Sequence, residues 1–157
     1  MSSEPLKKPA EAEPLYEADF FRWTQEQAEA LRTRRLADLD WANLAEEIET
    51  LGRSDRSEIR SRLTVILLHL LKWRYQPEQR KGGWKASIFE QRVRIADLLE
   101  DSPSLHSYPA TVLAKEYRIA RLKAADETGL PEDRFPETCP FTIEEILDET
   151  FLPKAEE

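Results

Sequence analysis

This sequence has very little cysteine, histidine or glycine. Its 157 residues include one cysteine, two histidines and four glycines. One cysteine excludes a disulfide within the chain, which is usual for a protein of the reducing cytoplasm. With 40% hydrophobic and 34% charged residues, the composition is typical of a folded helical protein and unlike that of a disordered or fibrous one.

Long apolar runs are absent as well. The most apolar stretch, residues 63–71, is flanked by Arg62 and Lys72, and it is much shorter than the roughly 20 residues that a membrane helix needs. The opening residues MSSEPLKKPAEAEPLY have no apolar core of the kind found in signal peptides. We therefore expect a cytoplasmic chain with no membrane partner.

The residue spacing that metal sites need is also missing. Di-iron sites in helical bundles use Glu-x-x-His pairs, but Ile66 and Pro103 stand three residues before His69 and His106. The HExxH motif is absent, and one cysteine with two distant histidines has no zinc-site spacing. We expect no metal site and no cofactor.

Charges of both signs are plentiful but unevenly distributed. The formal net charge is −8, which argues against non-specific nucleic-acid binding by the whole molecule. Residues 53–94 nevertheless contain 11 Lys/Arg and 4 Asp/Glu, a local net charge of +7, so the remainder carries −15. We expect basic central helices to pack beside acidic outer ones. The alternative is an exposed basic face for an acidic partner or RNA.

Apolar residues recur at helical spacing over most of the chain, and no segment alternates as a strand would. Residues 1–14 have three prolines and few apolar residues, so we expect a flexible tail there. Prolines and glycines then divide the chain into helices that we expect at about 24–36, 40–73, 84–100 and 107–128, with a short last helix.

Two capping boxes predict helix starts. Thr24 and Gln27 have the spacing at which a hydroxyl and an amide each satisfy a free backbone N–H, which predicts a helix that begins at Thr24. Thr142 and Glu145 repeat this pattern and predict the start of the last helix.

The segment 40–73 carries the longest apolar stripe, and the sequence GRSDRSE interrupts it in the middle. The segment is therefore either one long helix or two helices that meet at Gly52. We favour one helix, because no proline intervenes and a glycine costs a helix only about 1 kcal/mol relative to alanine. We predict an all-α fold, a single domain over 16–153 with about five or six helices bundled around a buried central helix at 59–73.

Several strings resemble one known family. They are, in order, LDWANLAEEIETLGRSDRSEIRSRLTVILLHLLKWRYQPEQR, SIFEQR, SPSL, ETGLP and FPETCPFTIEEILDETFLP. This combination resembles a bacterial family catalogued as a domain of unknown function, number twenty-nine in that series, over about Tyr16 to Pro153. The resemblance implies an all-helical domain and supplies no reaction, ligand or catalytic residue.

His69 stands in the middle of the most apolar stretch. We expect a structural histidine, neutral because it is buried and held by a carboxylate or a backbone carbonyl. A general base is the alternative, and a metal ligand is disfavoured.

An acid–base site would need partners for this histidine. Glu46 and Glu49 are one helical turn apart, and they would form such a site if their side of the bundle met His69. Arg53 or Lys72 would then hold an anion. The structural interpretation of the two glutamates is a solvated helix face with a surface ion pair.

Aromatic and basic residues lie close together around Gly82-Gly83. Trp73 and Trp84 are candidate ligand-binding residues, because base stacking and phosphate contacts use aromatic rings with basic neighbours. The neighbours here are Tyr75, Arg74, Arg80, Lys81 and Lys85. The structural interpretation is that the large rings seal the end of a bundle while the cations reach outward.

For function, we favour a non-enzymatic intracellular interaction module that binds a protein partner or a second copy of itself, because no catalytic or cofactor motif is recognisable. The alternative is an enzyme that uses Glu46 or Glu49 with His69. A third hypothesis, disfavoured but left open, is binding of RNA or an acidic partner through residues 53–94.

Overall fold

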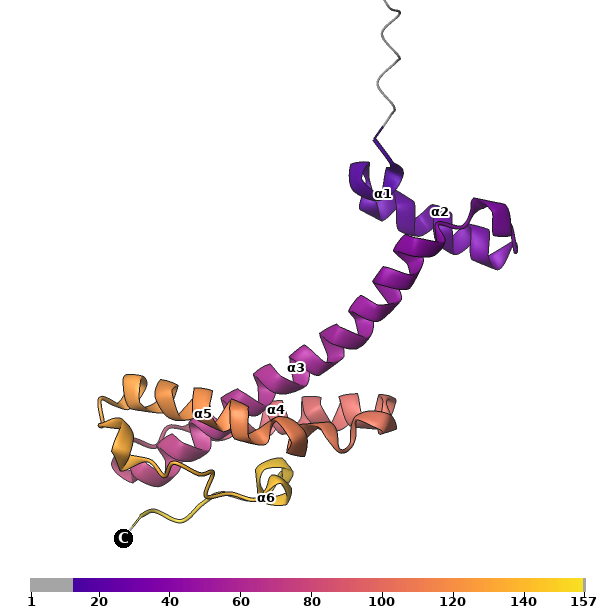
Figure 1. The fold of residues 1–157 in the computed structure, drawn as a ribbon. Coiled ribbons are helices and arrows are strands. Elements are labelled where there is room, and N and C mark those ends of the chain that lie inside the picture. Colours follow the sequence, from indigo (N-terminus) through magenta and orange to yellow (C-terminus); the bar gives the residue numbers. More distant parts are fainter. Residues whose placement is uncertain (1–12, 157) are drawn as a thin grey trace, which may run out of the picture. The chain divides into compact units, whose positions relative to one another are not determined.

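The computed structural model describes residues 13–156, which form six α-helices, four short 3-10 helices and no strand (Figure 1). This confirms the prediction of an all-α fold with five or six helices. The tail predicted over 1–14 lies almost wholly outside the described residues. The elements are α1 (Leu15–Ala18), α2 (Phe20–Arg32), η1 (Leu36–Asp38), α3 (Trp41–Tyr75), η2 (Pro77–Gln79), α4 (Gly82–Asp101), η3 (Pro103–Leu105), α5 (Tyr108–Thr128), η4 (Glu132–Arg134) and α6 (Ile143–Leu147).

The chain forms two compact units, one that ends at Leu51 and one that begins at Gly52. Helix α3 belongs to both units, so the expectation of a single domain over 16–153 stays a prediction. Within the described part of the chain, no helix is both long enough and apolar enough to cross a membrane.

Helix α3 is continuous from Trp41 to Tyr75, which confirms one helix in the place where two were conceivable. It begins after Asp40, whose carboxylate accepts a hydrogen bond from the backbone N–H of Asn43 at 3.4 Å. Gly52 lies inside the helix, and open space surrounds the position that its Cβ would occupy. The absence of proline leaves the backbone hydrogen bonds of α3 uninterrupted.

The first unit contains α1, α2, η1 and the beginning of α3. Helix α2 begins at Phe20, so the start predicted at Thr24 is wrong. The side chain of Asp19 caps this helix by accepting a 3.0 Å hydrogen bond from the backbone N–H of Arg22. Since α2 is already one turn long at Thr24, the Thr24 hydroxyl donates to the carbonyl of Phe21 instead.

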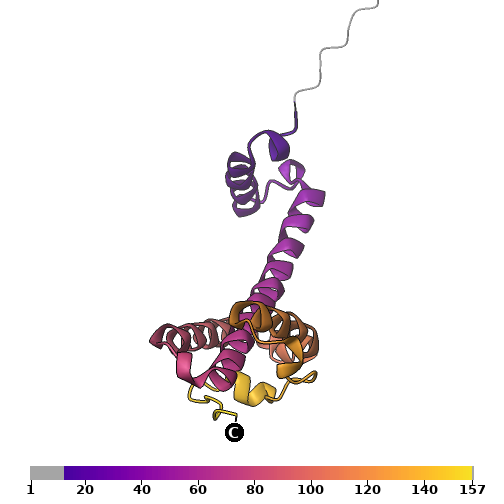
Figure 2. The same ribbon diagram turned by 90° about the vertical axis from the view of Figure 1, so that its left-hand side faces the viewer.

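The second unit has the central buried helix that the sequence predicted. Figure 2 shows the C-terminal half of α3 with α4 on one side and α5 on the other. The side chains of this half-helix that have no exposed surface are Ile59, Leu63, Ile66, Leu67, Leu70 and Leu71. They form one core with apolar residues of α4, α5 and α6.

The helix ends of the second unit follow the expected local chemistry. Helix α5 has Pro109 in its first turn and ends at Thr128, and Gly129 after it has a left-handed φ of 71°. Helix α6 has the predicted capping box, with Glu145 N donating to Thr142 Oγ1 and Thr142 N donating to the Glu145 carboxylate. The local signals for the end of α5 and the start of α6 are therefore confirmed.

Candidate functional site

His69 is half-buried on α3, and its ring contacts the protein backbone. The Nδ1 atom lies 2.7 Å from the carbonyl oxygen of Val65. Because a carbonyl oxygen can only accept, Nδ1 carries the proton and donates. This is the backbone-carbonyl contact that we expected of a structural histidine.

The two candidate glutamates lie far from His69 along the same helix. Glu49 and His69 are 20 residues apart in α3, which corresponds to about 30 Å at about 1.5 Å per residue. No side chain spans that distance, so α3 does not bring Glu46 or Glu49 to His69. Both glutamates and Arg53 make contacts of their own, while pairing of Glu49 with Arg53 stays a prediction.

The neighbouring acid, Glu47, makes a contact that the sequence did not indicate. The hydroxyl of Tyr16 donates a hydrogen bond to the Glu47 carboxylate. This hydrogen bond is the main reason that the pKa of Tyr16 rises to about 12, and desolvation adds to it. The contact fixes α1 on one side of α3.

The candidate ligand-binding tryptophans of the second unit are covered by cations of the same chain. The Lys72 Nζ atom lies 4.6 Å from the Trp84 ring centroid and 3.1 Å from Glu127. The Arg80 guanidinium lies 4.6 Å from the Trp73 ring centroid, and its Nε donates to the Trp73 carbonyl. One face of each ring is therefore occupied by an internal cation–π contact.

Other basic residues of segment 53–94 are also engaged. Arg60 donates to the Tyr108 hydroxyl, and Arg62 donates to Glu58 at 2.7 Å and to Gln91 at 2.8 Å. These contacts support the interpretation that the basic residues hold the helices together.

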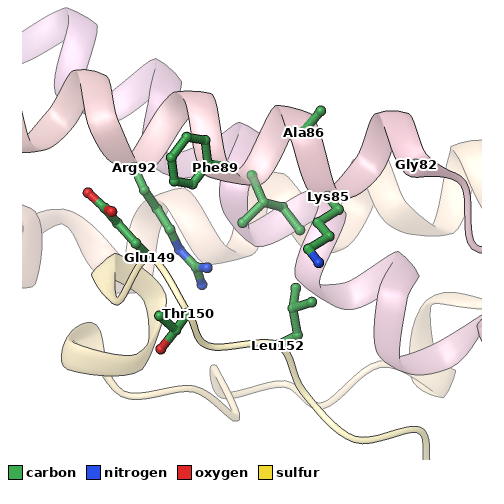
Figure 3. A pocket seen from close by; sticks show the side chains of 9 residues that line it. Gly82, Lys85, Ala86, Phe89, Arg92, Glu149, Thr150 and Leu152 are labelled. Carbon is green, nitrogen blue, oxygen red and sulfur yellow. The ribbon is translucent and has the colours of Figure 1, made fainter.

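A cavity of about 600 Å³ lies between α4 and the C-terminal segment (Figure 3). Its lining residues are Gly82, Lys85, Ala86, Ile88, Phe89, Arg92, Glu149, Thr150 and Leu152. Thr150 Oγ1 donates to Asp148, and the cavity lining contains no histidine or cysteine. It therefore offers an apolar floor with charged edges but no paired nucleophile and base.

Arg92 stabilises the wall of this cavity. Its side chain extends from α4 toward the C-terminal segment, as Figure 3 shows, and the residue is only 2% exposed. It donates hydrogen bonds to the carbonyl oxygens of Glu145, Ile146 and Phe151 at 3.2, 2.7 and 2.8 Å. Burial lowers the pKa of Arg92, but an arginine keeps its proton at neutral pH. These bonds make Arg92 a structural clamp.

Cys139 and the acidic and histidine side chains of residues 13–156 were the remaining candidates for a nucleophile or a metal site. Burial raises the pKa of the Cys139 thiol, which donates to the carbonyl of Phe141 at 3.4 Å. A raised pKa disfavours the thiolate that a nucleophile needs. Within residues 13–156, no group of three or more His, Cys, Asp or Glu side chains is placed to hold a metal ion.

The first unit has a feature that sequence analysis missed, which is that most of its large apolar side chains are exposed. Large apolar side chains that are exposed there are Phe20, Phe21, Leu31, Leu36, Trp41, Ile48 and Leu51. Its buried apolar side chains are Trp23, Ala30 and Leu39. Helical periodicity revealed the stripe that begins at Trp41 but gave no indication that the described residues leave it exposed. We call the seven exposed residues the apolar surface of the first unit.

Comparison with known proteins gives one match. The model of the family described as Domain of unknown function DUF29 matches residues 15–152. No curated protein and no solved structure matches the chain. The comparison therefore supports the all-helical resemblance and provides no reaction, ligand or partner.

Proposed function

The chain belongs to the DUF29 family, and from its own residues we propose that it is a non-enzymatic module that binds another protein chain. The observation that carries this proposal is the apolar surface of the first unit. Seven large apolar side chains are exposed in residues 13–51, whereas three apolar side chains are buried there. Trp41, Ile48 and Leu51 share one side of α3 by the helical period, and exposed apolar side chains that lie together on a surface mark interaction sites.

The small size of the first unit strengthens the proposal. The first unit ends at Leu51 and so has only about 50 residues, a size at which a folded unit buries a small share of its surface and is marginally stable. Residues 13–51 contain no cysteine. Association would supply the missing apolar contacts.

Neither alternative function has comparable support. The acid–base hypothesis needs Glu46 or Glu49 next to His69, and the length of α3 argues against that. The RNA hypothesis needs accessible cations and rings, whereas Lys72 and Arg80 lie over Trp84 and Trp73.

The cytoplasm is the compartment that we propose for this module. One cysteine in 157 residues is consistent with a reducing environment. The thiol of Cys139 packs in the second unit, where its pKa is raised by burial.

Site-specific photo-crosslinking in the native host tests the proposal. A photoreactive phenylalanine analogue would replace Phe21 or Ile48, which are 73% and 67% exposed. The matched control replaces Leu122, an apolar residue of α5 that is 55% exposed. Because all three positions are apolar and accessible, the control measures collisions that any exposed position would show.

We expect protein adducts from positions 21 and 48 and none from position 122. An adduct of any defined mass at the first two positions supports an interaction module, whether the partner is another protein or a second copy. Adducts that are missing at positions 21 and 48, or equally abundant at position 122, would overturn the proposal.

A further inference from the structure

The cavity between α4 and the C-terminal segment has the size and the lining of a small-molecule site. Its volume of about 600 Å³ lies in the range of about 300 to 1,000 Å³ that such sites have. Apolar side chains of Ile88, Phe89 and Leu152 form its floor (Figure 3). Ile88 is only 1% exposed, whereas the Phe89 ring is 50% exposed, so the floor presents an apolar surface that a ligand would cover. We call this site the α4 cavity.

Three charged side chains line the α4 cavity, and two of them compensate each other. Arg92 donates its hydrogen bonds to backbone carbonyl oxygens. The carboxylates of Asp148 and Glu149 attract its guanidinium and oppose the lowering of its pKa by burial. The Lys85 ammonium, in contrast, has no hydrogen bond or ion pair with any residue between 13 and 156. The lining therefore carries one uncompensated positive charge, which is complementary to a monoanion.

The uncompensated charge lies at one end of the apolar floor. Figure 3 shows the Lys85 side chain at one end of the α4 cavity and the side chains of Arg92 and Glu149 at the other, with Phe89 between them. Lys85 and Arg92 are seven residues apart on α4, which corresponds to about 10 Å at about 1.5 Å per residue. The floor therefore extends about 10 Å from the Lys85 cation.

We propose that the α4 cavity binds a medium-chain fatty acid as its carboxylate, with the head group at Lys85 and the alkyl chain over Phe89. An extended alkyl chain advances about 1.2 Å per bond, as an extended backbone does, so the chain of octanoate reaches about 8 Å. This length fits the floor. The inference goes beyond the proposed function, because it concerns the second unit, and neither depends on the other.

The charge of the cavity selects among apolar ligands of equal length. An alkyl ammonium would bring a like charge to Lys85, while an ester, such as the acyl chain of a lipid, has no carboxylate to pair with it. Because Lys85 is exposed, the pair with a carboxylate should be worth about a fivefold difference in affinity. Free octanoate is therefore the preferred ligand.

Titration of the full chain, labelled with nitrogen-15, is the first test. Butyrate, hexanoate and octanoate are added up to about 5 mM, and octanoate should bind with a dissociation constant of about 0.1 to 1 mM. Saturable NMR shifts should appear in the backbone amides of residues 82–92 and 149–152. Each added CH₂ group should strengthen binding by up to about fourfold. The absence of saturable shifts with octanoate, or an affinity that does not rise with chain length, overturns the inference.

The head group is tested with methyl octanoate, which keeps the alkyl chain and removes the charge. Octanoate should bind about fivefold more tightly than this ester. Equal affinity, or tighter binding of the ester, would show an apolar surface without anion recognition and would overturn the inference.

A lysine variant assigns the charge to one residue. Lys85→Gln should weaken octanoate binding about fivefold and leave the affinity for methyl octanoate unchanged. The matched control is Lys115→Gln on α5, which replaces another exposed lysine that does not line the cavity. It should bind octanoate like the parent. Parent-like binding by Lys85→Gln, or equal weakening in the control, contradicts the assignment.

An aromatic variant tests the floor. Phe89→Ala removes the exposed ring and should weaken both octanoate and methyl octanoate at least about fivefold. The matched control is Leu122→Ala, since Leu122 is 55% exposed and Phe89 is 50% exposed, and this variant should bind both ligands like the parent. Unchanged binding by Phe89→Ala, or weakening in both variants, would show that the ligand does not lie over Phe89.

Discussion

The indole Nε1 of Trp23 donates a 3.0 Å hydrogen bond to Oδ2 of Asp40. The same carboxylate accepts a 2.8 Å bond from the side-chain amide of Asn43. The side chain of Gln27 completes the network, since its Oε1 accepts from the backbone N–H of Asp40 at 2.7 Å and its Nε2 donates to the carbonyl of Asp38 at 3.1 Å. Four residues thus join α2 to the beginning of α3.

The first prediction concerns removal of the Asp40 carboxylate. Asp40→Ala removes the helix cap, which costs about 1 kcal/mol. It also leaves the buried indole N–H of Trp23 without an acceptor, which costs about 1 to 3 kcal/mol. Hydrogen exchange of backbone amides between residues 20 and 48 should accelerate accordingly. Asp40→Asn keeps an acceptor oxygen, so its loss of stability and its increase in amide exchange should be much smaller. Equal exchange rates in the two variants would contradict this account.

The second prediction concerns the pH at which Asp40 is protonated. Hydrogen bonds from Asn43, and then from Trp23, hold the pKa of Asp40 below its usual value. A lowered pKa in the folded state means that Asp40 contributes its stability fully above about pH 4 and loses it as the pH falls through the lowered value. The NMR shift of the Trp23 indole proton should therefore titrate below about pH 3.9. A midpoint at or above that pH, or the same titration in Asp40→Asn, would disprove the assignment.

Much of the helical fold could be predicted because its signals are local. The capping box at Thr142 and the glycine after Thr128 determine helix ends through contacts within a few residues. The same kind of pattern at Thr24 misled us, because Asp19 caps the helix one turn earlier. A short motif cannot reveal a competing cap upstream of it.

The candidate surface could not be predicted because coverage is not a local property. Ile48 and Ile66 occupy equivalent places in the periodic stripe of α3, yet one is 67% exposed and the other has no exposed surface. The difference arises from α4 and α5, which pack on the later half of the helix. Periodicity identifies which side of a helix is apolar, but only the tertiary structure identifies which part of that side is free.

The third prediction concerns the buried clamp at Arg92. Arg92→Met retains apolar volume but removes a donor from three backbone carbonyl oxygens, of which that of Glu145 keeps a second donor, the backbone N–H of Asp148 at 3.3 Å. Because hydrogen bonds to charged groups contribute about 1.5 to 3 kcal/mol each, the free energy of unfolding should fall by at least about 3 kcal/mol. Urea unfolding followed by circular dichroism measures this loss.

The matched variant for this clamp is Arg92→Lys. Lysine keeps the charge but cannot reproduce the planar fork that reaches Glu145, Ile146 and Phe151 together. It should therefore be less stable than the parent, with faster amide exchange in residues 143–153. A lysine variant as stable as the parent would show that charge alone holds this segment.

The fourth prediction concerns a buried polar pair between α3 and α5. Thr64 Oγ1 donates a 2.8 Å hydrogen bond to Oε2 of Glu116, and both residues are buried. Thr64→Val should cost about 1 to 3 kcal/mol, because it leaves the buried carboxylate short of a donor. The double variant Thr64→Val with Glu116→Leu should recover part of that loss. Urea unfolding of Thr64→Val, Glu116→Leu and the double variant gives the free energies of unfolding for a double-mutant cycle. Strictly additive losses would show that the two side chains are not coupled.

The fifth prediction compares two glycines that have open space around the Cβ position. Gly52 lies inside α3, where alanine is favoured over glycine by about 1 kcal/mol. Gly129 has a φ of 71°, where an L side chain costs about 1 to 2 kcal/mol. Gly52→Ala should therefore slow amide exchange around residue 52, whereas Gly129→Ala should lower the free energy of unfolding in urea. Because neither methyl group meets a neighbour, the opposite signs test backbone conformation alone, and two changes of the same sign would refute that explanation.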